Sequence, residues 1–220
     1  LTPTKRDDRG RKMRYALKEA GFTELLPLSL TSKTVLEKSG VNVRQTVTIE
    51  NPLGEELGTL HSHTLPALLE HAARNVLESA NGLKTFHWGH VFSKTIPEHP
   101  EVTILCVSPR GTEPKLANLP LLWVKAAVAH LCAEVGTKAH ITQEEASLPA
   151  HPGRSGKILV DGTEVGTVYE VHPEVLGTFG LPSRTAAATI DLSKLLSVSS
   201  KVRVPEKLPA FPPVTYDETL

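Results

Sequence analysis

The sequence has 220 residues, 40% of them hydrophobic, which is enough for one large domain or two small ones with a buried core. Lysine plus arginine and aspartate plus glutamate both number 24, so the formal charge is zero. This balance argues against a stand-alone protein that holds a nucleic-acid backbone over a wide surface. Apolar stretches fall short of the ~20 residues that span a membrane. The start, LTPTKRDDRGRK, is not typical of a signal peptide.

The two cysteines, Cys106 and Cys132, each lie in an apolar run, and the sequence has no C-x-x-C motif. This pattern favours two buried, reduced thiols over a zinc site or a redox pair. We therefore expect a cytoplasmic protein without membrane association. The chain starts without methionine and stops within a proline-rich stretch. We expect it to be a piece of a longer protein.

The first element expected is a helix over residues 6–22, with acidic residues at its start and Gly21 at its end. The segment 23–31 follows as an edge strand or a bulge, because Pro27 interrupts it. A short helix begins after Ser32 and closes at Gly40. Residues 44–50 alternate in polarity, which predicts a strand.

The strongest helix signal covers residues 64–79, with Pro66 in its first turn. Two strand candidates, 84–94 and 101–109, come next and suggest an antiparallel pair. A further helix is predicted over 121–136. A division of the chain near residues 110–120 is conceivable, although no clear linker marks it.

Asp161 and Gly162 form a tight-turn signal inside 157–171, which therefore predicts a hairpin. A short helix follows from Pro173 to Gly180, and then a strand with an appended turn over 185–196. From about residue 205 the chain is expected to be a proline-rich connector toward a further domain. Long helices interleaved with about six to eight strands, several of them in hairpins, indicate an α+β domain rather than a doubly wound parallel sheet.

Three segments together carry a family resemblance. NPLGEELGTLHSHTLPALLEHAARN, TFHWGHVFSK and HPGRSGKILVDGTEVGTVYEVHPEV resemble, in the same order, runs of bacterial phenylalanyl-tRNA synthetase β subunits. The likeness starts in GFTELLPLSL and ends in PAFPPVTYDET, so it covers nearly all of residues 1–220. The HPGRS block followed by His172-Pro173 one hairpin later is its most specific part.

The resemblance implies a catalytic-like module with an antiparallel sheet and flanking helices, similar to class II synthetases but without their chemistry. It also implies a heterotetramer with a catalytic α subunit that joins phenylalanine to tRNA, using ATP and magnesium. No cofactor is expected in this chain. Its first helix would correspond to one that packs across subunits, which makes Arg14, Tyr15 and Leu17 candidate contacts.

Four positions depart from the family pattern. His61, His87 and His90 stand where the family has arginine, glutamate and arginine, and Tyr169 stands where it usually has glycine. These changes fit a divergent member. They leave open which polar contacts the positions make here.

Adenylate formation needs cations aimed at a triphosphate. Class II synthetases supply them from R-x-E and G-x-G-x-G-x-E-R motifs, and this sequence contains neither an R-x-E tripeptide nor an E-R dipeptide. It also lacks a Walker lysine loop and a G-x-G-x-x-G. The sequence therefore predicts that this chain performs no ATP chemistry.

The block His151, Pro152, Gly153, Arg154 and Ser155 is predicted to be a loop, for which a structural role is favoured over a binding role. Gly153 would allow a backbone conformation closed to other residues, and Arg154 would hold a carboxylate. We expect that carboxylate to be Glu170. The step from His172 to Pro173 is expected to start a helix, although Glu170 and His172 could also form an acid–base pair.

Two other function classes stay open from the residues. One is a metal-dependent hydrolase whose histidines bind the metal, although residues three apart do not share a strand face. Its ligands would be His61 and His63, or His87 and His90, with His151 or His172 added. The other is a stand-alone RNA-binding or regulatory paralogue, against which the neutral charge argues.

Overall fold

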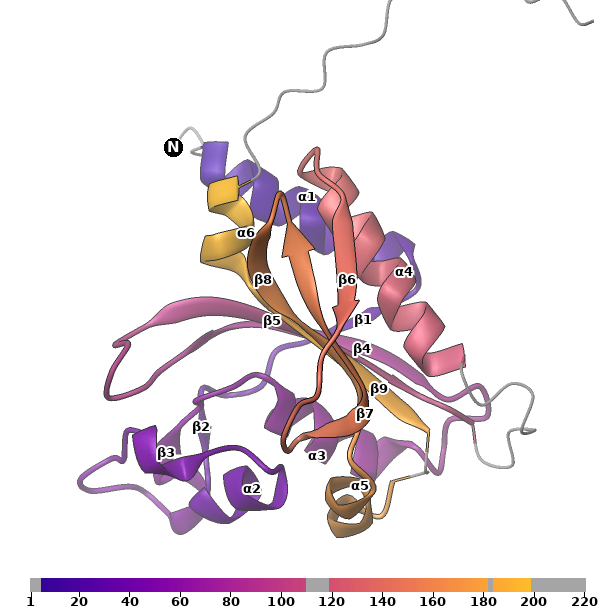
Figure 1. Ribbon diagram of the computed structural model, residues 1–220. Helices are drawn as coiled ribbons and strands as arrows, with labels where there is room; N and C mark the ends of the chain where they lie inside the picture. The colour runs from indigo at the N-terminus through magenta and orange to yellow at the C-terminus, as the bar shows by residue number, and fades with distance from the viewer. Residues whose placement is uncertain (1–4, 110–118, 182–183, 199–220) are drawn as a thin grey trace, which may run out of the picture.

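The computed structural model describes residues 5–109, 119–181 and 184–198 (Figure 1). The connector expected from about residue 205 lies outside the described residues. So do residues 110–118, where a division of the chain was considered. Strands from both sides of that segment belong to one sheet.

The central feature is a seven-stranded sheet that runs in the order β1-β4-β5-β9-β8-β7-β6. All neighbours are antiparallel except β1 and β4, which pair in parallel at one edge. The predicted α+β class with an antiparallel sheet is therefore confirmed, apart from one short parallel pair. The strands are β1 (Thr23–Leu25), β4 (Leu83–Val91), β5 (His99–Val107), β6 (Ala139–Gln143), β7 (Ala150–Val160), β8 (Thr163–Val171) and β9 (Thr185–Asp191).

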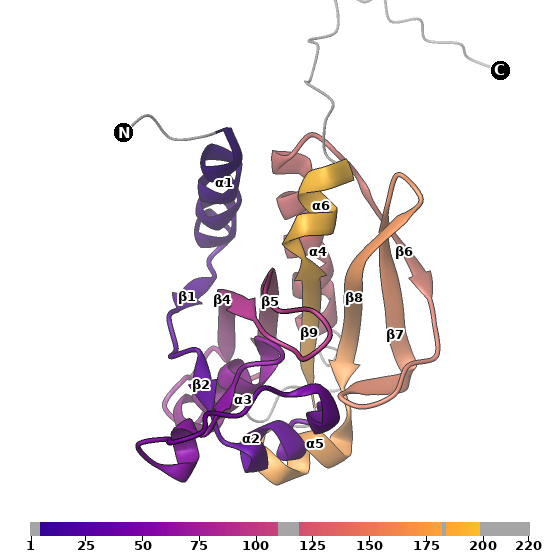
Figure 2. The ribbon, with the colours of Figure 1, turned by 90° about the vertical axis from the view of Figure 1, so that its left-hand side faces the viewer.

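Helices cover both faces of this sheet (Figures 1 and 2). One face carries α1 (Lys5–Glu19), α4 (Leu119–Glu134) and α6 (Leu192–Val198). The opposite face carries α3 (Leu65–Asn75) and α5 (Pro173–Phe179). Beside them lie α2 (Lys33–Lys38), the 3-10 turns η1 (Val43–Gln45) and η2 (Glu55–Leu57), and a two-stranded sheet of β2 (Leu30–Thr31) and β3 (Thr59–Leu60).

Strand β5 shows why the sheet has two apolar cores. Val102, Ile104 and Cys106 pack in the core under α1 and α4, whereas Leu105 and Val107 pack in the core against α3. Because both faces of the strand are buried, residues 104–107 are apolar without alternation, and the polar Glu101 and Thr103 in its first half are buried as well.

The prediction of a strand over residues 44–50 is wrong. The chain forms η1 there, and only Thr48 makes an isolated bridge, to Thr59. Local hydrogen bonds account for the turn: Asn42 Oδ1 accepts from the Arg44 N–H at 3.0 Å, and Thr46 Oγ1 donates to the Val43 carbonyl at 2.7 Å.

Two other sequence predictions need correction. Segment 23–31 is not one strand, because β1 and β2 lie in different sheets on either side of Pro27. The block from His151 to Ser155 is not a loop, because it belongs to β7. The sequence prediction also lacked β6, whose residues AHITQ are too polar to stand out as a strand.

Candidate functional site

The contact predicted between Arg154 and Glu170 is present. Arg154 Nη1 donates to both carboxylate oxygens of Glu170, each at 2.9 Å. A second guanidinium, which the sequence did not suggest, reaches the same carboxylate: Arg184 Nη1 lies 3.0 Å from Oε2. Since only 9% of the Glu170 side chain is exposed, these partners compensate for the loss of its hydration.

The block before Arg154 forms an irregularity in β7. The pairing of β7 with β8 shifts between Ala150 and Ser155. Gly153 is not among the described glycines with positive φ, so the special backbone conformation predicted for it is not adopted. Its N–H donates to His151 Nδ1 at 3.2 Å, and Ser155 Oγ donates to the Glu144 carbonyl at 2.5 Å. These bonds hold the bulged strand in place.

The expected start of a helix at Pro173 is confirmed. His172 is the N-cap of α5, and its Nδ1 accepts from the Glu174 N–H at 3.2 Å. The His172 ring lies 6.1 Å from the His151 ring, so the bulge and the helix start are neighbours. The Glu170 side chain points to the α4 side of the sheet, where it contacts Arg154 and Arg184.

A buried polar network lies on the opposite face of the sheet. Glu101 of β5 accepts from the Thr64 backbone N–H at 2.7 Å and from Thr64 Oγ1 at 2.8 Å. The Thr103 hydroxyl lies 2.7 Å from that of Thr64 and 2.9 Å from that of Thr189. The Tyr169 hydroxyl lies 3.4 Å from Thr189 Oγ1. Sequence reasoning missed this network, because single threonines within apolar strands give no distinctive pattern.

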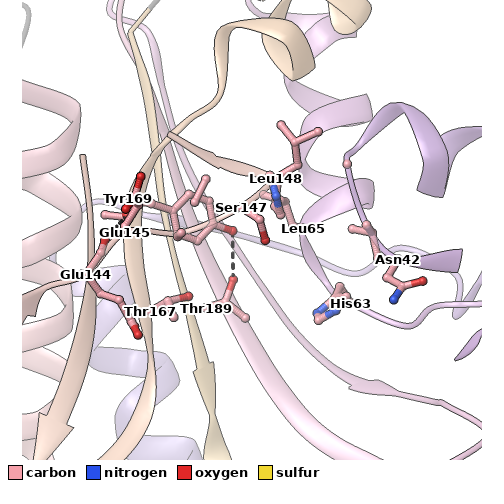
Figure 3. A pocket seen from close by; sticks show the side chains of 17 residues that line it. Asn42, His63, Leu65, Glu144, Glu145, Ser147, Leu148, Thr167, Tyr169 and Thr189 are labelled. Carbon is pink, nitrogen blue, oxygen red and sulfur yellow. Dashed lines mark hydrogen bonds between the residues drawn. The ribbon is translucent and has the colours of Figure 1, made fainter. Parts of the chain in front are cut away.

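This network borders a pocket of about 440 Å³ (Figure 3). Asn42 and His63 lie toward one end of the pocket, and Glu144 and Glu145 lie toward the other. Among the described residues that line it there is no arginine and no lysine. The polar groups offered to a ligand are therefore carboxylates, hydroxyls, an amide and one histidine.

His63 and Glu101 are coupled at the edge of this pocket, with His63 Nδ1 3.4 Å from Glu101 Oε2. Burial alone would raise the pKa of Glu101, but His63 and the two donors of Thr64 outweigh it and lower the pKa. Burial likewise acts to lower the pKa of His63, and the carboxylate of Glu101 overcomes it, so the pKa is raised. The pair thus favours a charged imidazolium beside a carboxylate.

Comparisons with known proteins give the family. The model of the phenylalanyl tRNA synthetase beta chain CLM domain matches residues 2–192. The chain belongs to this family. It is 30% identical over 216 residues to the phenylalanine–tRNA ligase beta subunit of Symbiobacterium thermophilum, covering 93% of this chain and 24% of that protein. It is 32% identical over 203 residues to the same subunit of Clostridium acetobutylicum, covering 90% of this chain and 25% of that protein. The chain thus spans about a quarter of the length of these relatives.

Among solved structures, the chain is similar to a pyrrolysyl-tRNA synthetase from Desulfitobacterium hafniense. The TM-score is 0.72 at 13% identity, over 88% of this chain and 69% of that one. A likeness at this identity concerns the fold alone. It confirms the predicted class II synthetase-like architecture.

Within this beta chain domain, the candidate contacts on α1 do not share one environment. Tyr15 is 59% exposed, and Arg14 lies over the Trp88 ring with its Cζ 5.0 Å from the centroid. Leu17, in contrast, is fully buried in the core under α1. Leu17 is therefore not an exposed contact, because it faces the sheet rather than solvent.

Of the three histidines expected to diverge from the family pattern, two lie next to each other and the third pairs with a glutamate. The His61 and His87 rings are 6.4 Å apart and buried, whereas His90 pairs with Glu98 at 3.7 Å on the surface. Burial, and secondarily the charge of His87, lowers the pKa of His61 to about 4. Within the part of the chain that the structure describes, no group of three or more histidine, cysteine or acidic side chains could hold a metal ion.

Tyr169 is buried against α3 and α5. Both cysteines are also buried, and burial raises the pKa of Cys106 to about 12 and that of Cys132 to about 11. Neither thiol is thus prepared to act as a nucleophile. Among the described helices, none combines the length and the apolar character needed to cross a bilayer.

Proposed function

We propose that this chain is a non-catalytic structural module of the phenylalanine–tRNA ligase beta subunit. In this proposal it supports assembly with a catalytic alpha subunit in a cytoplasmic heterotetramer. ATP, magnesium and tRNA are then handled by the complete synthetase, and the chemistry takes place outside this chain.

The observation that carries the proposal is the composition of the pocket on the α3 face of the sheet. ATP presents several negative charges, which a synthetase must neutralise as pyrophosphate leaves. The pocket offers Glu144 and Glu145, and its described lining contains no arginine or lysine. Lys157 Nζ lies 2.7 Å from Glu144 Oε1, and His63 pairs with Glu101, so both cations near the pocket already have a carboxylate partner. Glu145 adds a further negative charge, and the described surroundings of the pocket thus offer a triphosphate no excess of positive charge. The missing R-x-E and E-R motifs agree with this argument.

The exposed surface of α1 is the proposed contact with the alpha subunit. Tyr15 offers a large aromatic side chain to solvent, and Arg14 is held beside it by Trp88 and by Glu24, whose Oε1 lies 3.5 Å from Arg14 Nε. Aromatic and arginine side chains are frequent anchors of protein interfaces. The relatives' name, a beta subunit, is consistent with a partner of this kind.

Co-expression with the catalytic alpha subunit of the same organism tests the proposal. The complete beta subunit should retain a tagged alpha subunit on an affinity resin, and the purified complex should charge tRNA with phenylalanine. Purification of the beta subunit without any retained alpha subunit would contradict the proposal. Stoichiometric zinc in the purified chain would favour the metal-dependent hydrolase instead.

A further inference from the structure

The two edges of the main sheet differ in how they are protected against pairing with a further strand. At one edge β1 has only three residues and is followed closely by Pro27, which cannot donate a hydrogen bond. At the other edge β6 has five residues, Ala139–Gln143, and pairs only with β7 among the described strands (Figure 2). Neither proline nor lysine, the usual blockers of edge pairing, occurs within β6.

The register of β6 and β7 identifies the backbone groups that face outward. Glu144 N–H donates to the Ser155 carbonyl at 3.1 Å, so this pair is a hydrogen-bonded one. Hydrogen-bonded and non-hydrogen-bonded pairs alternate along an antiparallel ladder. His140 and Thr142 therefore bond to β7, whereas the N–H and carbonyl groups of Ile141 and Gln143 point toward the free edge.

A cationic pocket of about 490 Å³ lies next to this edge, on the α4 side of the sheet. Lys125 and Arg154 line it together with Glu170. Since Arg154 and Arg184 already share the Glu170 carboxylate, the cluster of Lys125, the two arginines and Glu170 has an excess of positive charge.

Apolar side chains complete the pocket. Leu122 of α4 is 56% exposed and Ile141 of β6 is 37% exposed, and both line the pocket. Ile141 is paired with Ile158, whose side chain belongs to the core under α4, so Ile141 also points to the α4 side. The edge backbone, the cations and the apolar contacts thus lie together on one side of β6.

We propose that β6 is a docking edge for an acidic, extended segment of a partner protein. The segment adds as a further strand through the outward backbone groups of Ile141 and Gln143. Its side chains on the α4 side are a carboxylate toward Lys125 and Arg154 and an apolar residue toward Leu122. Main-chain bonds of this kind give affinity, and alternate side chains give specificity. The inference does not depend on the proposed function, because it concerns the edge opposite to β1 and α1.

The test uses the complete synthetase complex and a fluorescent peptide with blocked ends that repeats the sequence Glu-Thr-Val-Thr. Because every second residue of a strand points to the same side, glutamate and valine alternate along one face of this peptide. Binding is measured by fluorescence anisotropy at low and moderate salt. A peptide with lysine in place of glutamate is the control for charge. We expect saturable binding of the acidic peptide that weakens with salt, and at least tenfold weaker binding of the basic one.

Substitutions at two positions separate the contribution of the β6 backbone to peptide binding from the contribution of charge. Ile141→Pro removes one outward N–H and leaves the bonds of His140 and Thr142 to β7 intact, so it should weaken binding at least tenfold. Its matched control, Ile141→Thr, keeps the N–H and should stay within about threefold of the wild type. Lys125→Glu, on the surface of α4, should weaken binding of the acidic peptide tenfold and strengthen binding of the basic peptide.

Three results would overturn the proposal: no binding of the acidic peptide to the wild-type complex, equal binding of the acidic and basic peptides, or full binding by Ile141→Pro. The Lys125→Glu variant keeps the test decisive even if Ile141→Pro unfolds, because it leaves the β6 backbone unchanged.

Discussion

Arg184 reaches the carboxylate of Glu170 from the position just before β9, with its Nη1 3.0 Å from Oε2. The Arg184 carbonyl accepts from the Ser108 N–H at 3.0 Å, which fixes the backbone beside β5. With Arg154 approaching from β7, a single buried carboxylate connects β7, β8 and the start of β9.

This shared carboxylate predicts that the two arginines substitute for each other in part. Arg154→Ala or Arg184→Ala alone should lower the free energy of unfolding by about 1–2 kcal/mol, because the other guanidinium still pairs with Glu170. The double variant should lose about 3–5 kcal/mol, more than the sum, because a buried carboxylate is then unpaired. Urea denaturation of the four proteins measures the coupling, and strictly additive losses would argue against a shared partner.

The buried His61 predicts a loss of stability in mild acid. Because its pKa in the folded protein is about 4 and its ordinary pKa is 6.5, the unfolded chain binds the proton first. Its contribution to stability is complete above pH 6.5 and falls as the pH drops toward 4. Between pH 7.5 and 5 the free energy of unfolding should fall by about 2 kcal/mol from this residue.

His61→Gln, which does not titrate, is the matched control for this pH effect. Its free energy of unfolding should depend less on pH than that of the wild type over the same interval. His63 works in the opposite sense, since its raised pKa adds stability below pH 6.5 that is lost at higher pH. Identical pH profiles for the wild type and His61→Gln would show that His61 is accessible to protons in the folded protein.

The different environments of Tyr15 and Leu17 predict different defects. Tyr15→Ala should weaken retention of the alpha subunit at least tenfold without a change in melting temperature, because the side chain is exposed. Leu17→Ala should instead cost about 2–5 kcal/mol of stability, because it leaves a cavity in the core. Pull-down assays and thermal unfolding separate the two effects.

Leu77→Ala is the control for exposure in this experiment, since Leu77 is 59% exposed, as is Tyr15. It follows α3, on the opposite face of the sheet. We expect Leu77→Ala to keep full retention of the alpha subunit. Equal retention by Tyr15→Ala and Leu77→Ala would remove α1 as the assembly surface.

The sequence predicted well where a local signal was strong. The turn at Asp161-Gly162, the helix after Pro173 and the contact between Arg154 and Glu170 all agree with the structure. In the first two cases the signal is chemical, because positive φ favours glycine and asparagine or aspartate, and proline suits the first residue of a helix. In the third case the prediction used an arginine and a carboxylate that lie in neighbouring segments, and both segments resemble the family.

Features that depend on long-range contacts were missed. Arg184 meets Glu170 only because β8 and β9 are paired, and Glu101 meets Thr64 across 37 residues. Strand β6 has an exposed, polar sequence, and only its pairing with β7 defines it. Residues 44–50 show the converse, because alternation predicted a strand and local hydrogen bonds gave a turn instead.

The exchange of pyrophosphate into ATP in the presence of phenylalanine tests the central claim most directly. The complex of alpha and beta subunits should catalyse the exchange, and the complete beta subunit alone should not. Glu145→Ala, in the pocket whose described lining contains neither lysine nor arginine, should leave the rate of the complex unchanged. Exchange by the beta subunit alone, or its loss in an intact complex carrying Glu145→Ala, would contradict the account of this chain as a scaffold.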